Sequence, residues 1–187
     1  MKEYKNKNLF FPEPVLILGS YDKDGNPDAM NAAWGGRHDY EEIFVSLASH
    51  KSTENILLKK QFTVAFADLS HAAAADYVGL VSLSKEPAKM EKSGLKIEKA
   101  PHVDAPWFPD FPISIECEVK RFEKDEEGGG ILIGKILHSF VREDALNEKG
   151  ELDLDKAHLI CLDEASHSYR EIGGVIAKAF EAGLSLK

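Results

Sequence analysis

The chain has 187 residues, which is enough to bury a sizeable core, and we expect one domain over residues 1–187. Its hydrophobic fraction of 43% and charged fraction of 29% are those of an ordinary globular protein. The formal net charge of -9 argues against a nucleic acid or an anionic membrane surface as a partner, because both repel a negative chain.

The N-terminus and the cysteines suggest where the protein works. Pro12, Glu13 and Pro14 interrupt the first apolar run, so it does not resemble a secretory signal. No stretch reaches the ~18 apolar residues of a membrane span. Cys117 and Cys161 lie in separate apolar runs, which predicts two buried reduced thiols. We therefore expect a cytoplasmic protein without a disulfide or a metal site.

The first fifty residues have the pattern of an antiparallel sheet. Asp24-Gly25 is typical of a tight hairpin turn, and Gly35-Gly36 is expected to break a strand. No helical pattern separates these apolar runs, which excludes a strand–helix–strand beginning. The strands are predicted at residues 15–21, 29–34 and 43–49.

Two short helices are predicted next, with a strand between them. Ser52 or Thr53 is expected to cap the first helix. Ser70 is expected to cap the second helix, and Gly79 to end it. The first helix is predicted within residues 52–61, the strand at 62–68 and the second helix within 70–82.

The second half of the chain returns to strands after a proline-rich segment. Residues 85–112 are too irregular and too long for a simple connection, so we expect a lid or a functional segment. Residues 113–124 alternate apolar and polar side chains, as a half-exposed strand does. The remaining elements are predicted as strands at 131–143 and 157–165 and a C-terminal helix at 169–184, weakened by Gly173-Gly174.

Six or seven strands with a few short helices predict a closed or half-closed antiparallel barrel, which leaves few exposed edges. Side chains fill the interior of a barrel this small. A large cofactor must therefore lie at the rim or at a subunit interface.

Residues 49–55 are the strongest candidate for chemistry. They end a strand and open a helix, so free backbone amides and the helix dipole favour an anion there. Lys51, Ser52 and Thr53 add a positive charge and two hydroxyl groups. An ordinary helix start with solvated lysines is the alternative, and neither of the two commonest nucleotide-binding motifs is present.

A second segment, residues 28–34, also has side chains that suit the binding of a planar ligand. Small residues around Asn31 and Trp34 would let a planar ring approach the backbone, and the Asn31 amide can donate or accept a hydrogen bond at the ring edge. The alternative is that Trp34 is a core aromatic side chain.

Five segments in order resemble the flavin reductase-like family: "PVLILGSYDKDGNPDAMNAAW", "FVSLASHKSTENILLKKQFTVAF", "DYVGLVSLSKEPAKMEKSGL", "IECEV" and "ILIGKILH". The resemblance covers residues 14–174 and is strongest to the flavoredoxin branch. It implies a mainly β fold, an FMN-binding split barrel of antiparallel, Greek-key-like strands with a few flanking helices. It also implies a homodimer that holds FMN near its interface.

The resemblance places the phosphate at residues 51–53 and the flavin ring against two strands. In this sequence Asp28 stands close to the expected ring edge, and a carboxylate there would disfavour an anionic reduced flavin. Leu83 replaces a small residue and is expected to narrow the nicotinamide side. The resemblance and the residue patterns together predict these cofactor-binding residues: Asp28, Met30, Asn31, Ala32, Trp34, Ser46, Leu47, Ala48, His50, Lys51, Ser52, Thr53, Val81, Ser82 and Lys89, with His138 and Tyr169 as weaker matches.

The leading functional hypothesis is an oxidoreductase in which FMN passes electrons from NAD(P)H to an acceptor. The cofactor supplies the hydride chemistry, so no catalytic residue is predicted. The alternatives are a non-enzymatic flavin-binding electron carrier, a split-barrel protein that holds haem or another cofactor, and a ligand-free barrel that mediates protein contacts.

Overall fold

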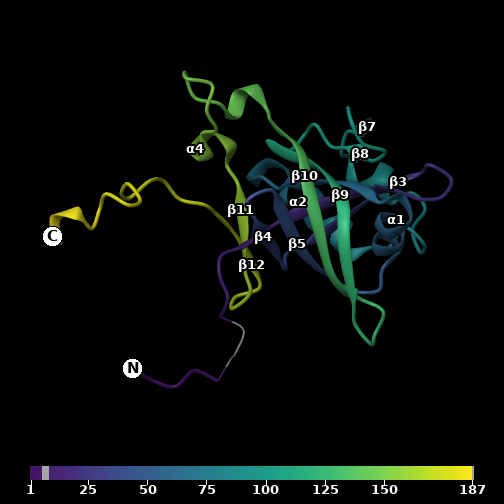
Figure 1. Cartoon of the computed structure of the whole chain (residues 1–187), viewed down its shortest axis with the longest axis horizontal. Helices are drawn as coiled ribbons and strands as arrows, with labels where there is room; N and C mark the ends of the chain where they lie inside the picture. The colour runs from purple at the N-terminus through teal and green to yellow at the C-terminus, as the bar shows by residue number, and fades with distance from the viewer. Residues whose placement is uncertain (6–8, 187) are drawn as a thin grey trace.

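The computed structural model describes residues 1–5 and 9–186, so part of the N-terminal segment interpreted above lies outside the described residues. A seven-stranded antiparallel sheet forms its centre, in the order β3-β2-β6-β9-β10-β5-β4 (Figure 1). Its strands are β2 (Leu16–Tyr21), β3 (Pro27–Ala32), β4 (Gly35–Asp39), β5 (Glu42–Leu47), β6 (Gln61–Phe66), β9 (Ile113–Lys124) and β10 (Gly130–Val141).

The sheet curls so that β3, near one edge, contacts β5, near the other. No backbone pairing joins these two strands in the described part of the chain, so the barrel is split along this line. Apolar side chains from both halves fill the interior, among them Leu18, Val45 and Phe62. The predicted half-closed barrel with a filled interior is therefore confirmed.

A second core covers the outer face of β2 and β6. Ile17 and Ala65 point to this face and pack against α2 (Ala72–Leu80) and α3 (Lys89–Ser93). Because β2 carries apolar side chains on both faces, all but the last of its residues are buried. A helix thus covers the sheet close to the split.

The remaining elements are short. Helix α1 (Lys51–Lys59) follows β5, and a small sheet of β1 (Glu13–Pro14), β11 (Ile160–Asp163) and β12 (Ser168–Glu171) lies beside the barrel. The others are the β7–β8 hairpin (Glu98–Lys99 and Pro106–Trp107), α4 (Leu154–Ala157) and the 3-10 turns η1 (Leu69–His71), η2 (Glu143–Ala145) and η3 (Leu184–Leu186). None of the helices in the described residues is long and apolar enough to cross a membrane.

Three local predictions are wrong. Gly35 starts strand β4 instead of breaking a strand, and a Cβ atom there would lie 3.0 Å from the backbone oxygen of Phe44, so the absence of a side chain allows β4 to pack closely on β5. Gly79 lies inside α2, which continues to Leu80. The side chain of Asp68, not that of Ser70, accepts a hydrogen bond from the amide of His71 at the start of η1.

The predicted C-terminal helix is also wrong. Residues 168–171 form β12 and pair with β11. Beyond them the chain has no regular element until η3 and forms turns at residues 179–183, and its large apolar side chains are exposed. A helix that contains two glycines and packs its apolar residues against no other element is marginal in water, so residues 168–171 pair with β11 instead.

The two cysteines follow expectation. Cys117 and Cys161 are both buried and both free thiols. Burial raises the pKa of each thiol, because the thiolate is poorly solvated in the interior. Neither is therefore a reactive nucleophile at neutral pH.

Candidate functional site

Helix α1 begins at the rim of the barrel, directly after β5. His50 is its N-cap residue, with extended backbone angles of φ -120° and ψ 163° and no side-chain cap. The predicted capping by Ser52 or Thr53 is therefore wrong. Since amides in the first turn of a helix have no intrahelical acceptor, those after His50 are available to a ligand in front of the helix.

The two predicted hydroxyl donors are engaged within the protein. Ser52 Oγ donates to Asp28 Oδ2 at 2.6 Å, and Thr53 Oγ1 donates to the carbonyl oxygen of Ala48 at 2.8 Å. Both side chains are buried. In this arrangement the hydroxyls position the start of α1, which leaves the backbone amides as its free donors.

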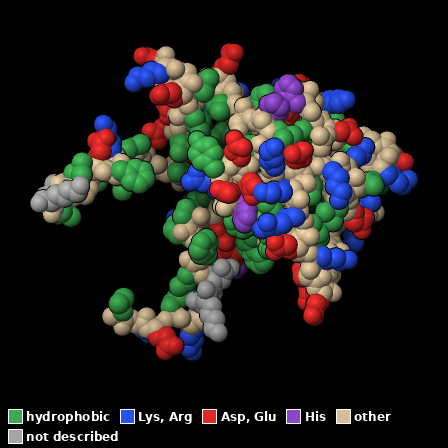
Figure 2. Space-filling view, in the orientation of Figure 1, with side chains coloured by type: hydrophobic (Ala, Val, Ile, Leu, Met, Phe, Trp, Pro, Cys, Tyr) green, Lys and Arg blue, Asp and Glu red, His purple; other side chains and the backbone are tan. Residues whose placement is uncertain are grey.

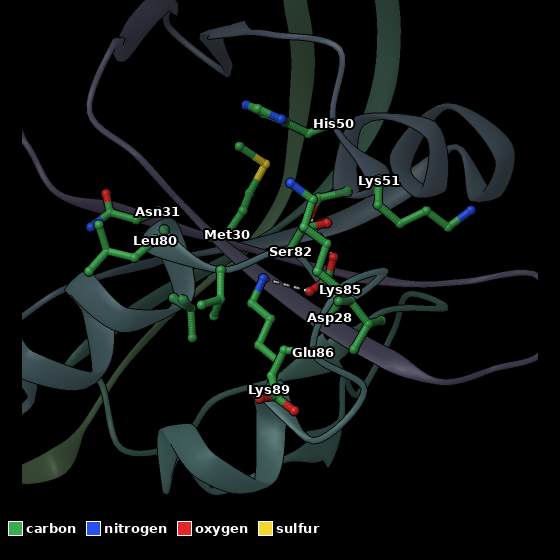
Figure 3. Close-up of a pocket in the computed structure, with 15 residues that line it drawn as sticks. Asp28, Met30, Asn31, His50, Lys51, Leu80, Ser82, Lys85, Glu86 and Lys89 are labelled. Carbon is green, nitrogen blue, oxygen red and sulfur yellow. Dashed lines mark hydrogen bonds and ion pairs between the residues drawn. The ribbon is translucent and has the colours of Figure 1, made fainter.

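A buried ion pair lies beneath the start of α1. Lys89 Nζ donates to Asp28 Oδ1 at 2.9 Å and to the carbonyl oxygen of Ala29 at 2.6 Å (Figure 3). Ser52 donates to the second oxygen of Asp28, so the carboxylate accepts two charge-assisted hydrogen bonds from side chains. This network connects α3, β3 and α1, three elements that are separate in sequence.

A first cavity of about 350 Å³ opens above this network, between the start of α1 and the end of α2 (Figure 3). Lys51, Lys85 and Lys89 contribute positive charge, and Asp28 and Glu86 contribute negative charge. The formal balance of these groups is positive in a chain that is negative overall. The cavity is lined by Asp28, Met30, Asn31, His50, Lys51, Ser52, Val78, Gly79, Leu80, Val81, Ser82, Leu83, Lys85, Glu86 and Lys89.

A second cavity of about 560 Å³ follows the split between β3 and β5. It shares Met30, Asn31 and His50 with the first cavity, so the two cavities adjoin, and together they are called the groove. Asp125 and Glu127 from the β9–β10 turn give it a negative edge. Its full lining is Met30, Asn31, Ala32, Ala33, Trp34, Ser46, Leu47, Ala48, Ser49, His50, Asp125, Glu127 and Gly129.

Asn31 lies where the two cavities meet, and its hydrogen bonds give it one chemical role there. Its amide nitrogen donates to the carbonyl oxygen of Ala75 at 3.0 Å and to Tyr169 Oη at 3.4 Å. Both donor protons are thereby directed at α2 and β12. The side-chain oxygen is left as an acceptor for a ligand N–H group.

Tyr169 supports Asn31 from outside the groove. Its hydroxyl donates to Asp76 Oδ1 at 2.7 Å, which connects β12 to α2. Burial raises the pKa of Tyr169 to about 12, and the hydrogen bond to the Asp76 carboxylate adds to the shift. The phenol is therefore neutral at physiological pH and able to hold the Asn31 amide in place.

The predicted cofactor residues are largely brought together by the fold. All except three line one of the two cavities. Thr53 lies on the inner side of α1 and Tyr169 behind Asn31, while His138 lies in β10 in a separate cluster with His102 and Glu116. Which of these residues contact a cofactor stays a prediction.

Sequence reasoning missed several lining residues. Lys85 and Glu86 fall in the irregular segment of residues 85–112, and Asp125 lies between the strands predicted at 113–124 and 131–143. The signal for Lys85 was available, since it lies shortly after the second helix predicted within residues 70–82. No local signal places Asp125 beside β5, because that contact depends on pairing between β5 and β10.

The fold is a split antiparallel barrel. A cationic helix start lies at its rim, and a wide groove follows its split. These features together define a class of cofactor-binding proteins. Comparison with family models identifies that class: residues 8–172 match the flavin reductase like domain. The chain belongs to this family, whose fold is the FMN-binding split barrel. The family and fold expected from the sequence are thus confirmed.

Solved structures of the same fold include two flavoredoxins. The flavoredoxin of Desulfovibrio vulgaris (Miyazaki F) is 30% identical with a TM-score of 0.90, over 98% of this chain and 99% of that one. Flavoredoxin from Methanosarcina acetivorans is 25% identical with a TM-score of 0.88, over the full length of both chains. Nitrilotriacetate monooxygenase component B from Bacillus cereus, 22% identical with a TM-score of 0.76 over 90% and 88% of the chains, shares the fold. A search of curated proteins found no match.

Proposed function

We propose that this chain binds FMN across the two adjoining cavities and works as a flavin-dependent oxidoreductase of the flavin reductase or flavoredoxin type. The observation that carries the proposal is the pairing of the two cavities. One has a helix N-terminus and three lysines, and the other is wide and follows the barrel split. A phosphate tail matches the first and a flat uncharged ring matches the second.

The donor set fits FMN on chemical grounds. Backbone amides at the start of α1, with Lys51 and Lys85, would hold the phosphate. The Asn31 oxygen would accept from an N–H at the edge of the ring. Asp125 and Glu127 make the second cavity unfavourable for a phosphate, which supports this orientation.

When bound, FMN supplies the redox chemistry, and the residues of this chain bind, orient and shield it. No side chain in the described groove is required as a general acid or base by this proposal. NAD(P)H is the proposed electron donor. The match to the flavin reductase like domain supports a reductase reaction of this kind.

A non-enzymatic electron carrier is the second candidate. The likeness to two proteins named flavoredoxin supports it. Leu83, which was expected to narrow the nicotinamide side, lines the cavity proposed for the phosphate and therefore does not decide between the two candidates. The carrier would bind FMN equally well and oxidise NAD(P)H slowly.

Two measurements test the proposal. Titration with FMN and with riboflavin should show binding of both, with FMN tighter by more than about tenfold, because charge-assisted hydrogen bonds to phosphate contribute about 1.5–3 kcal/mol. Equal affinities would contradict the phosphate assignment, and an absence of flavin binding with a haem spectrum would favour the haem alternative. NAD(P)H oxidation no faster than that of free FMN would exclude the reductase and leave the carrier.

A homodimer is part of the proposal. Both terminal segments leave the body on the same side and carry exposed apolar side chains (Figures 1 and 2). Phe10 is 79% exposed, and Ile176 and Phe180 are each 100% exposed, which is unfavourable unless a partner covers them. Light scattering should give twice the chain mass, and deletion of residues 172–187 should weaken the dimer. Free thiols at both cysteines support the proposed cytoplasmic location.

A further inference from the structure

A cluster outside the groove joins three metal-ligating side chains. His102, Glu116 and His138 each place one ligand atom within 4.8 Å of the other two. They come from the β7–β8 connection, from β9 and from β10. We propose that this cluster binds one divalent first-row transition-metal ion of the Zn²⁺ type, although the sequence alone predicted no metal site.

Glu116 supplies the independent observation. Its side chain is 0% exposed, and its Oε2 has no hydrogen-bond partner among the residues that the structure describes. Its Oε1 accepts from the backbone amide of His102 at 3.0 Å. A buried carboxylate oxygen without a partner is costly, and a bound cation would satisfy it.

A β-bulge brings His138 to the same face as Glu116. Ile136 pairs with Cys117, and His138 pairs with Glu116, so Leu137 is the extra residue on β10. Residues directly opposite one another on paired strands point to the same face, whereas a regular ladder would have turned His138 away. The bulge therefore has a consequence for chemistry: it aligns an imidazole with the buried carboxylate.

The connection from β7 to β8 brings His102 to this face, where its backbone amide donates to Glu116. Thr63 Oγ1 donates to the carbonyl oxygen of Pro106 at 2.6 Å, which holds the connection against β6. Ala100, Val103 and Ala105 are buried beside Leu137. The backbone at His102 is thus fixed, while the imidazole itself is exposed and can rotate.

The ligand set and spacing select the metal. Two imidazoles and one carboxylate are ligands typical of Zn²⁺ and its neighbours, whereas Mg²⁺ and Ca²⁺ prefer oxygen alone. Bonds of about 2.0–2.2 Å in a tetrahedron separate ligand atoms by about 3.4 Å. The three ligand atoms lie within 4.8 Å of one another, so the exposed imidazoles of His102 and His138 must rotate inward to reach this spacing. A water molecule would complete the coordination.

The test is calorimetric titration of Zn²⁺ into chelator-treated, dialysed full-length protein. We expect one ion per chain and a rise in Tm with Zn²⁺, because an ion that binds only the folded state stabilises it. His102→Ala and His138→Ala should each weaken binding by at least about tenfold. Mg²⁺ should give no saturable heat.

His158→Ala is the matched control, since His158 is an exposed histidine beside Glu171, with Nδ1 and Oε1 2.7 Å apart. It should bind Zn²⁺ as the wild type does. Glu116→Gln should also lose Zn²⁺ binding. Because Glu116 is buried, circular dichroism must show that this variant still folds. The variants of the two exposed histidines therefore decide whether the proposal holds. Absence of stoichiometric binding, or wild-type affinity in both histidine variants, would overturn the proposal.

Discussion

Asp28 and Lys89 form a buried ion pair 2.9 Å long, and their side chains are only 1% and 2% exposed. The pair lies at the floor of the proposed phosphate cavity and connects β3 to α3. It changes the interpretation of Asp28, whose carboxylate was expected to disfavour an anionic reduced flavin. Because Lys89 compensates the charge locally, the effect on a bound flavin should be smaller than for an isolated carboxylate.

Removing Lys89 should destabilise the protein strongly. Lys89→Met leaves the Asp28 carboxylate buried and uncompensated, so the free energy of unfolding should fall by about 3–5 kcal/mol. Urea unfolding measures the loss, and Asp28→Asn in the same chain should restore part of it. Lys92 lies on the same helix as Lys89 and forms an exposed ion pair with Glu86. Lys92→Met removes this pair and should cause a far smaller loss in the free energy of unfolding. Similar losses in the two lysine variants would contradict this account.

Stability should fall between pH 10 and pH 12 because of Tyr169. Its folded pKa is raised to about 12 from an ordinary value of 10, so the unfolded chain releases the proton first as pH rises. The stabilisation is present below pH 10 and is lost as pH rises through 12. Urea unfolding across this range should show a shallower decline for Tyr169→Phe than for the wild type, and identical slopes would refute the assignment.

Gly79 should be required for close packing of α2 on β3. A Cβ atom at this position would lie 2.8 Å from Asn31 Cβ, so Gly79→Ala must displace the helix or the strand. We expect a loss of about 1–3 kcal/mol in the free energy of unfolding, together with weaker flavin binding. Gly173→Ala is the control, since it meets no atom within 4 Å, and it should leave both quantities unchanged.

Charge reversal at the start of α1 should weaken FMN binding more than riboflavin binding. Lys51 lines the first cavity, and its amine pairs with the exposed Glu54 at 3.1 Å, from which it can turn to a phosphate. Lys51→Glu should lower FMN affinity by about tenfold or more, and added salt should reduce the difference. Lys149→Glu changes the net charge equally on an exposed turn and should have no such effect. Equal losses for FMN and riboflavin would show that the phosphate lies elsewhere.

The sequence determined the elements whose signals are local. Alternating side chains specified β9, Asp24-Gly25 specified the first hairpin, and the junction at residues 49–55 indicated the helix start at the rim. These patterns suffice because the spacing of apolar side chains and the demands of tight turns act over a few neighbouring residues.

The tertiary structure decided what depends on partners far along the chain. Ser52 was expected to face a ligand, but Asp28 accepts its hydroxyl proton inside the protein. The last segment became β12 because β11 offered it backbone partners. Most of all, the cluster of His102, Glu116 and His138 exists only because a bulge and a long connection bring three separate segments to one face. Local propensity carries no information about such long-range pairing, whose energy is gained only when the sheet is assembled.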